Sequence, residues 1–531
     1  MAIGDLALVL HAHLPYVRSS ELGSLEEDWY FQALQECYLP LLAVLEAAAA
    51  DPAQQPRLTL GLSPTLLALL SDPELNHRFV PWLEQRLQLL QEAPQELAVA
   101  ASDLDQRLQR ARAQFLACDG NLLPRFRRLQ QDGVLDLISC AATHGYLPLL
   151  RDSPEAVRAQ LRTALREHQR LLGDRPLGLW LPECAYYEGL DHLMAGCGLR
   201  YSLLDGHGLL HALPRPRYGV YAPICAPAGV AFFGRDSTST LPVWSASQGY
   251  PGDGAYREFH RDLGWDLPEA SLGNCGIRSR RPLGLKLHRV TAQGCPLEDK
   301  QPYQPAVAAG RVQEHAQRYL QGRADQLEAL AATMDRAPLL VAPFDAELFG
   351  HWWFEGPDFL AELFRQGPAA GVRFTHLREV LGRPMALQVC QPSPSSWGAG
   401  GYHDYWMNAT NTWVVAEWQR ASRAMVRRVN RGVGSTAQRQ WLAQAGRELL
   451  LAQSSDWSFI LRAGTTTDLA RDRIHRHLDR FWRLLDAIET GSAPPADWLA
   501  AVQGEDGLFP SLNAADWASL PPREAPPAQR A

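Results

Sequence analysis

What the chain lacks narrows its possible functions. Its nine cysteines are scattered, with no C-x-x-C pair, so they predict reduced thiols in a cytoplasmic protein and no cysteine metal site. The net charge of −7 provides none of the basic excess that usually marks nucleic-acid-binding proteins. No run approaches the roughly 18 apolar residues of a membrane span, and residues 1–17 contain no basic residue of a signal peptide. We expect no nucleic-acid and no membrane partner.

What the chain has is an alternation of short apolar runs with longer helical patterns. The runs span residues 6–10, 58–62, 134–140, 177–181, 201–204, 230–233 and 339–342. Between them, residues 153–172 show helical spacing behind a Ser-Pro start. Buried strands alternating with helices predict a parallel sheet, and seven repeats favour a closed or nearly closed α/β barrel. An open doubly wound sheet is the alternative, but no G-x-G-x-x-G follows a strand.

The composition changes after residue 390. Residues 391–405 are rich in Pro, Ser and Gly and predict a linker or lid after a barrel domain, with inserted helical segments, over residues 1–390. Apolar residues then recur with helical spacing, which predicts an all-helical C-terminal domain over residues 406–518. The tail, residues 519–531, is expected to be disordered.

Ionisable residues follow six of the seven predicted strands. They are His11, His13, His144, Glu183, Asp205, His207, Arg235, Asp236, Asp345 and Glu347. The parallel strands of a barrel direct their C-terminal ends to one face, where barrel enzymes keep their active sites. A single histidine after a strand is more often a packing residue, but this accumulation predicts a functional site.

Glu183 and Asp345 are the strongest catalytic candidates in this set. Each follows a strongly apolar strand within three residues, and aromatic residues lie next to each in the sequence. Two carboxylates in an aromatic cleft are the minimum machinery for glycoside chemistry: one attacks the anomeric carbon, and the other protonates the leaving oxygen. An apolar environment and a neighbouring negative charge would both raise the pKa of the acid.

Five ordered segments of the chain resemble the motifs of a known family. They are HAHLPYV (11–17), ATHGYLPLL (142–150), LWLPECAY (179–186), APFDAELFGHWWFEGP (342–357) and SSDWSFI (454–460). They are similar to the motifs of glycoside hydrolase family 57, and most of all to those of its 1,4-α-glucan branching enzymes. The resemblance covers nearly the whole chain.

The resemblance implies a distorted seven-stranded (β/α) barrel with a helical C-terminal domain, a retaining mechanism and no metal or other cofactor. It places the nucleophile on Glu183 and the acid/base on Asp345. It also implies substrate-binding roles for His11, His13, His144, Arg235, Trp244, Gly252, Trp397, Trp406 and Asp456. Asp456 lies in the helical domain, so that domain would form one wall of the cleft.

Branching enzymes of the family also carry a tyrosine on a mobile loop over the active site. Tyr218 is the best match by position, because residues 213–223 contain two prolines and two arginines and read as a loop. Its role would be to shield the glucosyl-enzyme from water. The alternative is an ordinary surface tyrosine packed on a proline.

The activity implied by the resemblance is cleavage of α-1,4-glucan and transfer of the chain to a 6-hydroxyl, with amylose or glycogen as donor and acceptor. An α-amylase or a 4-α-glucanotransferase would use the same two carboxylates. The spacing His11-x-His13 leaves a metal-dependent sugar hydrolase or deacetylase open. A non-catalytic protein, with some of the sixteen tryptophans as sugar platforms, is the fourth possibility.

Overall fold

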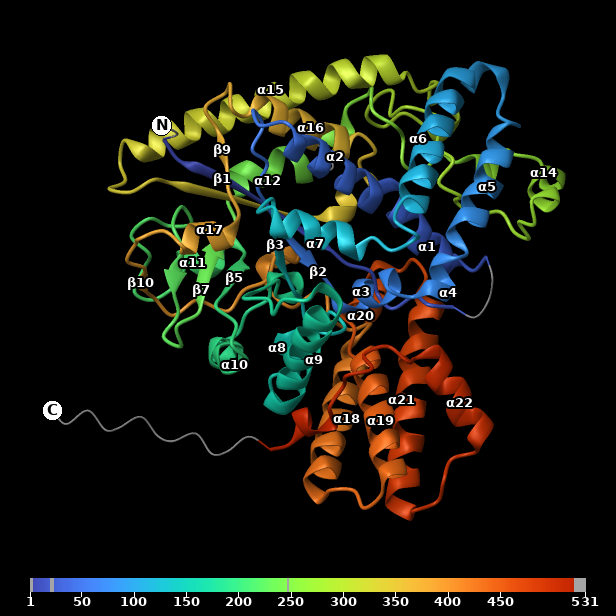
Figure 1. Ribbon diagram of the computed structural model, residues 1–531, viewed down its shortest axis with the longest axis vertical. Helices are drawn as coiled ribbons and strands as arrows, with labels where there is room; N and C mark the ends of the chain where they lie inside the picture. The colour runs from blue at the N-terminus through green and yellow to red at the C-terminus, as the bar shows by residue number, and fades with distance from the viewer. Residues whose placement is uncertain (1–2, 20–22, 246–247, 520–531) are drawn as a thin grey trace.

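The computed structural model describes residues 3–19, 23–245 and 248–519, and within these ranges ten strands form two sheets (Figure 1). The strands are β1 (Asp5–Ala12), β2 (Leu58–Leu62), β3 (Leu135–Ile138), β4 (Gly178–Leu179), β5 (Tyr201–Leu204), β6 (Ile224–Cys225), β7 (Ala231–Gly234), β8 (Leu339–Asp345), β9 (Arg373–Phe374) and β10 (Gln388–Val389). The seven predicted apolar runs all form strands. The three strands that were not predicted have only two residues each, too few for a sequence pattern.

Parallel pairing dominates both sheets. The first has the order β3-β2-β1-β8, with β9 beside the start of β1, and all of its pairs are parallel. The second has the order β10-β6-β7-β5-β4, and only β6 and β7 are antiparallel. β1 pairs with β8 from Asp5 opposite Leu339 to His11 opposite Asp345. This register brings two predicted site residues, His11 and Asp345, side by side at the C-terminal ends of their strands.

The two sheets do not close into a barrel by strand pairing among the described residues. On one side a single parallel bridge joins Ser139 to Leu179. On the other side, the Asp236 amide donates a hydrogen bond of 2.9 Å to the Val341 carbonyl of β8. Asp236 is also the N-cap of the helix that starts at Ser237, so the chain turns into a helix where pairing with β8 would begin. The predicted seven-stranded barrel, closed or nearly closed, is therefore not confirmed: the strands form two separate arcs in which most pairs are parallel.

Helices surround the sheets. Those that precede β8 are α1 (Leu25–Ala33), α2 (Leu39–Ala50), α3 (Pro64–Leu70), α4 (Pro73–Asn76), α5 (Phe79–Leu90), α6 (Ala98–Leu116), α7 (Leu123–Gln131), α8 (Leu147–Leu150), α9 (Pro154–Leu172), α10 (Leu190–Gly196), α11 (Gly206–Leu210), α12 (Ser237–Trp244), α13 (Leu263–Asp266), α14 (Glu269–Asn274) and α15 (Pro305–Ala331). Those that follow β8 are α16 (Gly356–Gln366), α17 (Leu377–Leu381), α18 (Thr412–Arg431), α19 (Thr436–Ala452), α20 (Ser455–Ala463), α21 (Thr467–Thr490) and α22 (Ala496–Glu505).

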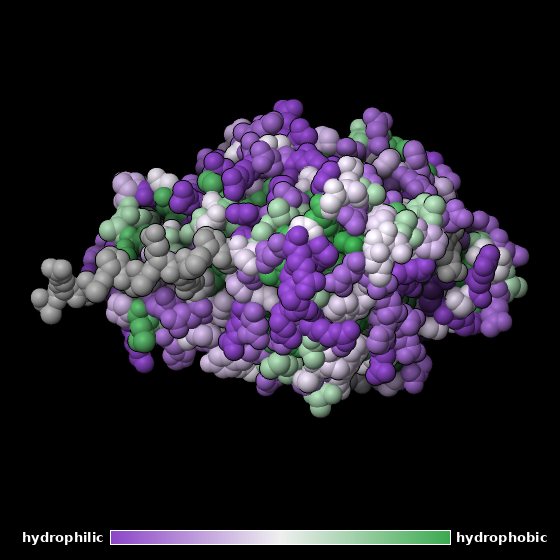
Figure 2. All heavy atoms as spheres, turned by 90° about the horizontal axis from the view of Figure 1, so that it is seen from below, coloured by the Kyte–Doolittle hydropathy of each residue, from purple (hydrophilic) through white to green (hydrophobic). Residues whose placement is uncertain are grey.

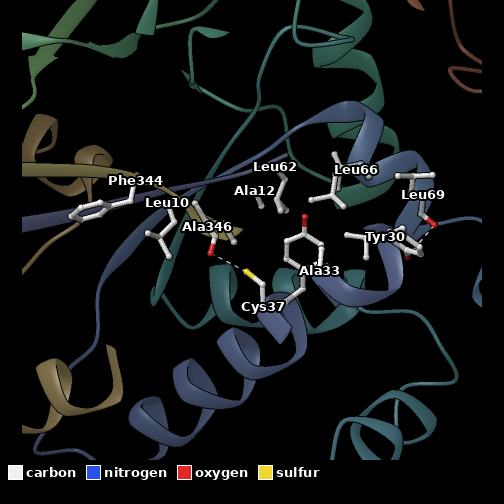
Figure 3. Close-up of a cluster of buried hydrophobic side chains, with 14 of the residues drawn as sticks. Leu10, Ala12, Tyr30, Ala33, Cys37, Leu62, Leu66, Leu69, Phe344 and Ala346 are labelled. Carbon is white, nitrogen blue, oxygen red and sulfur yellow. Dashed lines mark hydrogen bonds between the residues drawn. The ribbon is translucent and has the colours of Figure 1, made fainter. Parts of the chain in front are cut away.

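One helical stretch, Leu25–Ala50, packs into the core beside the sheet. It consists of α1, a π-helical turn at Leu34–Tyr38, and α2. Figure 3 shows Tyr30, Ala33 and Cys37 of this stretch facing side chains from β1, β2 and β8. Within the described residues it is the one helix long and apolar enough to cross a membrane, but 61% of its most apolar segment is buried inside the protein. It therefore packs as a core helix.

The last helices gather at one end of the molecule, below the sheets in the view of Figure 1. α18, α19 and α21 pack against one another, and α20 lies between them and the sheets. Seen from that end, the surface is mainly hydrophilic, with hydrophobic residues in scattered patches (Figure 2). The predicted helical character of this region is confirmed. Of the tail predicted to be disordered, residues 520–531 lie outside the described residues.

Candidate active site

A cleft of about 660 Å³ opens at the C-terminal ends of the strands. Of the twelve predicted site residues, seven line it: His11, His13, His144, Glu183, Asp345, Trp397 and Asp456. They come from β1, from the loops after β3 and β4, from β8, from residues 391–405 and from α20. Segments far apart in the sequence therefore converge on one concave site, as in other α/β enzymes.

The backbone around Glu183 is strained. Pro182 ends the extended segment after β4, and Glu183 then adopts a left-handed conformation with φ of 60°. Cys184 and His144 also have positive φ values, of 50° and 55°. Such conformations cost non-glycine residues about 1–3 kcal/mol each and persist only where surrounding contacts impose them. Their concentration at the cleft is typical of an active site.

Trp397 holds the Glu183 side chain in place. Its indole Nε1–H donates a hydrogen bond of 2.7 Å to Oε2 of Glu183, and its backbone amide donates one of 3.0 Å to the Glu183 carbonyl. His144 lies on the other side, with Nδ1 4.0 Å from Oε1. Residues 391–405, predicted as a linker or lid, thus supply a partner of the first candidate carboxylate.

Burial changes the protonation of both candidate carboxyls. It raises the pKa of Glu183 to about 8, because desolvation outweighs the Trp397 hydrogen bond, and the nearby Asp345 adds to the rise. Burial also raises the pKa of Asp345 to about 6, against the opposing positive charges of His13 and Arg235. Between these two values the pair holds one proton, which is the state that a nucleophile and a general acid require.

His13 and Asp456 form an ion pair at the wall of the cleft. The His13 Nε2 lies 3.1 Å from Oδ2 of Asp456, and Nδ1 lies 2.9 Å from the Ser63 hydroxyl. Burial disfavours both charges, but the pairing prevails: the pKa of His13 is raised, and that of Asp456 is held below its usual range. α20 therefore fixes a charged side chain against a strand end, and the helical region forms one wall of the site, as predicted.

His11 and His144 are neutral members of a stacked column. The rings of His13 and His144 are 4.0 Å apart, and His11 stacks on Trp180 at 4.6 Å. Burial, with the neighbouring histidines, lowers the pKa of His11 and of His144 well below the usual value. Neither ring nitrogen of His11 has a hydrogen-bond partner among the described residues. Buried polar atoms normally have a hydrogen-bond partner, so the two ring nitrogens of His11 are an exception that needs an explanation.

Ligand atoms of His13, His144 and Asp456 lie within 4.8 Å of one another, a spacing that could hold a metal ion. A metal requires a neutral imidazole with a free lone pair. The raised pKa of His13 instead favours the protonated ring, and both of its nitrogens already face protein partners. The donor set therefore suits an ion pair better than a metal ion.

Arg235 and Trp244 lie at the edge of the cleft. The Arg235 guanidinium is 5.8 Å from the Trp397 ring and 6.0 Å from the Trp244 ring. The two indole rings are 5.5 Å apart, and Trp244 is partly exposed. Both residues thus contact Trp397, which itself binds Glu183, without lining the cleft.

Two other predicted site residues lie away from the cleft. Trp406 is only 1% exposed and stacks on Tyr146 at 4.4 Å, so it is a core residue without a face for a sugar. Gly252 belongs to a short helical turn after α12 and does not line the cleft. The resemblance to the family implied a binding role for both, but the structure places neither of them at the cleft.

The structure places Tyr218 away from the cleft. The loop of residues 213–223 contacts the start of β8, where the Leu339 amide donates a hydrogen bond of 3.0 Å to the Tyr221 carbonyl. The catalytic candidate Asp345 is at the other end of this strand, roughly 20 Å away for seven extended residues. In this structure Tyr218 therefore does not cover the cleft.

Side-chain contacts explain the position of Tyr218. Its hydroxyl donates a hydrogen bond to Asp335, and the Arg336 guanidinium lies 4.7 Å from its ring. Both partners belong to the turn between α15 and β8. These contacts hold the tyrosine at the end of the strands opposite to the cleft. It lies there as an ordinary surface tyrosine, the alternative given by the sequence.

Sequence reasoning gave several residues of the cleft no role in binding or catalysis. The most prominent polar one is Glu347, two residues after Asp345, whose Oε1 accepts hydrogen bonds from the Tyr38 hydroxyl at 2.5 Å and the His13 amide at 3.0 Å. Burial raises its pKa to about 7. Glu347 was noted among the ionisable residues that follow the strands, but it was not assigned a role. Four aromatic residues of the cleft were missed altogether: Trp29, Phe259, Trp265 and Phe459.

Comparisons with known proteins agree with this geometry. The family model described as glycosyl hydrolase family 57 matches residues 7–267, and the one described as 1,4-alpha-glucan branching enzyme, C-terminal, matches residues 417–517. A probable 1,4-alpha-glucan branching enzyme of Mycobacterium tuberculosis is 32% identical over 547 residues, covering 96% of this chain and 97% of that protein. The chain belongs to glycosyl hydrolase family 57.

Similar solved structures extend the likeness over the whole fold. An α-amylase, AmyC, from Thermotoga maritima is 34% identical with a TM-score of 0.89, over 97% of this chain and 99% of that chain. A family 57 branching enzyme from Pyrococcus horikoshii is 30% identical with a TM-score of 0.88, over 99% and 98%. The resemblance identified from the five motifs is confirmed, with an α/β fold built on parallel strands.

Proposed function

We propose that this protein is a 1,4-α-glucan branching enzyme, which cleaves an α-1,4 bond and transfers the released chain to a 6-hydroxyl of an acceptor glucan. The observation that carries the proposal is the buried pair Glu183 and Asp345 at one cleft, with Asp456 contributed by a helical region that matches branching enzymes. The donor and the acceptor are both α-1,4-glucans such as amylose or glycogen. The nine free cysteines fit a cytoplasmic protein.

In this mechanism Glu183 attacks the anomeric carbon and Asp345 protonates the leaving oxygen, then deprotonates the acceptor hydroxyl. Inversion at each of the two steps leaves the anomeric configuration unchanged. In this structure the higher pKa belongs to Glu183, the reverse of the order that these roles need. A bound donor places its glycosidic oxygen against Asp345 as a hydrogen-bond acceptor, which favours the proton there and leaves Glu183 ionised against Trp397.

The other cleft residues position the sugar. The ion pair of His13 and Asp456 offers a fixed polar edge at the wall of the cleft, and the neutral His11 ring supports it from behind. The two arcs of strands act together as the distorted seven-stranded barrel of the family, with residues 391–405 and the helical region of residues 406–518 as walls. Exclusion of water by these walls favours transfer to a sugar over hydrolysis.

The direct test is to incubate the purified protein with amylose and to count new α-1,6 linkages, after enzymatic debranching, against new reducing ends. A branching enzyme forms α-1,6 linkages with few net reducing ends. Formation of reducing ends without α-1,6 linkages would overturn the proposal. Retention of activity in a strong chelator is expected, and its loss would favour the metal-dependent alternative.

An α-amylase is the second candidate function. The observation that favours it is that Tyr218 lies at the far end of β8, so the predicted shield over the glucosyl-enzyme is missing from that loop. The likeness to AmyC points the same way. In the amylose experiment this alternative predicts that reducing ends rise in proportion to the bonds cleaved.

A further inference from the structure

Two adjacent tryptophans that follow Asp345 have opposite environments. Trp353 is 1% exposed and packs in the core, whereas Trp352 is 57% exposed. Leaving so much of an indole in water forgoes the stabilisation that burial would bring. A lone exposed tryptophan needs no explanation, but this one lines the same cleft as Glu183 and Asp345.

A tight turn fixes the direction of Trp352. The Gly350 amide donates a hydrogen bond of 2.7 Å to the Trp353 carbonyl, and Gly350 has a φ of 116°. A Cβ atom on Gly350 would lie 1.8 Å from the Glu36 carbonyl oxygen, so only glycine fits there. The turn sends Trp353 into the core and leaves Trp352 in the cleft.

Neighbouring side chains hold the Trp352 ring. It stacks on Phe259 with centroids 4.5 Å apart and an interplanar angle of 24°, and the Lys286 ammonium lies 3.7 Å from the Phe259 ring. The preceding His351 is anchored by its Nδ1, 2.6 Å from the buried carboxylate of Glu36. The indole is therefore preorganised: one face rests on Phe259, and exposed surface remains for a ligand.

A second exposed tryptophan lies on the same cleft. Trp265 of α13 is 48% exposed and lines the cavity together with Phe259 and Trp352. Flat apolar faces with a polar edge suit the faces of pyranose rings, whose hydroxyls point outward. A chain that passes between the two catalytic carboxyls can thus continue along an aromatic wall.

We propose that Trp352, supported by Phe259, is a stacking platform for a glucosyl unit of an α-1,4-glucan outside the bond that reacts. Trp265 extends this subsite along the same cleft. The inference rests on the proposed function for the identity of its ligand. The platform strengthens the binding of long chains and takes no part in bond cleavage, because Trp352 carries no group that exchanges protons with the substrate.

Calorimetric titration with maltoheptaose tests the platform without turnover if all proteins carry Glu183→Gln. Adding Trp352→Ala should weaken binding roughly tenfold, as loss of a central aromatic contact commonly does. Trp352→Phe should restore most of the affinity. The matched control is Trp498→Ala on α22, a half-buried tryptophan under the Arg483 guanidinium that does not line the cleft, and it should bind like the parent.

The outcomes separate the platform from the proposed function. If the Trp352→Ala variant binds maltoheptaose as tightly as the parent does, the platform is overturned and the proposed function stands. If the parent itself binds no α-1,4-glucan, the platform and the proposed function are both overturned. In the active enzyme, Trp352→Ala should raise KM for amylose roughly tenfold and leave kcat within about twofold. A fall in kcat with unchanged KM would also overturn the platform.

Discussion

At the start of β1 the Asp5 carboxylate is paired with Arg373 and Arg383, whereas near the end of the same strand neither ring nitrogen of His11 has a partner among the described residues. The contrast recurs on neighbouring strands. The Tyr201 hydroxyl, at the start of β5, donates to the buried Asp136 of β3 at 2.7 Å. At one end of the strands these buried polar groups are paired, whereas at the cleft end the buried ring nitrogens of His11 have no partner among the described residues.

The same strands stabilise the fold at one end and carry the candidate catalytic residues at the other. Burial raises the pKa of Asp136 as it does those of Glu183 and Asp345, so desolvation alone does not mark a catalytic group. The C-terminal end of the strands is distinguished by its cleft, by the strained backbone around Glu183 and by neighbouring polar atoms without partners in the described part of the chain. Changes at the cleft should therefore affect turnover, and changes at the other end should affect stability.

The largest effect is expected from the two carboxyls of the cleft. Glu183→Gln should lower the rate on amylose by at least about 10³-fold, because no covalent intermediate can form, and Asp345→Asn should do the same because the leaving oxygen stays unprotonated. Counting products per enzyme measures both. Wild-type activity in either variant would refute its assigned role.

Trp397→Phe should have the next largest effect. It keeps a ring beside Glu183 but removes the Nε1–H donor, and hydrogen bonds to charged groups contribute about 1.5–3 kcal/mol, or roughly ten- to a hundredfold in rate. The donor favours the ionised carboxylate, so its loss should raise the pKa of Glu183 and move the alkaline limb of the pH profile upward. If the alkaline limb of the pH profile does not move, Trp397 does not control the pKa of Glu183.

The pH dependence of kcat/KM should be a bell with limbs near about 6 and about 8, the pKa values of Asp345 and Glu183. Below the lower value both groups are protonated and no nucleophile remains. Above the upper value both are ionised and no acid remains. The rate should fall roughly tenfold for each pH unit beyond either limb. A single sigmoid would exclude a shared proton on this pair.

A change at the opposite end of β1 should separate stability from activity. Asp5→Asn removes the charge that Arg373 and Arg383 share, and those partners are themselves partly exposed. We expect a loss of roughly 1–3 kcal/mol in the free energy of unfolding, measured in denaturant, with kcat unchanged. A fall in kcat of the folded variant would show that the start of β1 also affects turnover.

The smallest effect is expected from Tyr218→Ala. The residue contacts Asp335 and Arg336 at the start of β8, so the ratio of α-1,6 linkages to reducing ends should stay as in the wild type. Linkage counting after incubation with amylose measures that ratio. A marked rise in hydrolysis would mean that the loop moves across the molecule during turnover.

Local sequence patterns predicted most of the fold. The seven apolar runs became strands because each buries hydrophobic side chains, and Ser153-Pro154 marked the start of α9 because proline suits the first turn of a helix. The two-residue strands β6, β9 and β10 escaped detection, since so short a segment is defined by its neighbours. The break between β7 and β8 also depends on tertiary contacts of α12.

The sequence by itself determined that Glu183 and Asp345 follow buried strands, because apolar runs that end in carboxylates are a local property of the chain. Tertiary structure alone decided which aromatic residues meet them. Packing buries Trp406, carries Tyr218 to the far edge of β8, and leaves Trp352 exposed on a turn that Gly350 imposes. These outcomes depend on contacts between segments hundreds of residues apart, which no local pattern encodes.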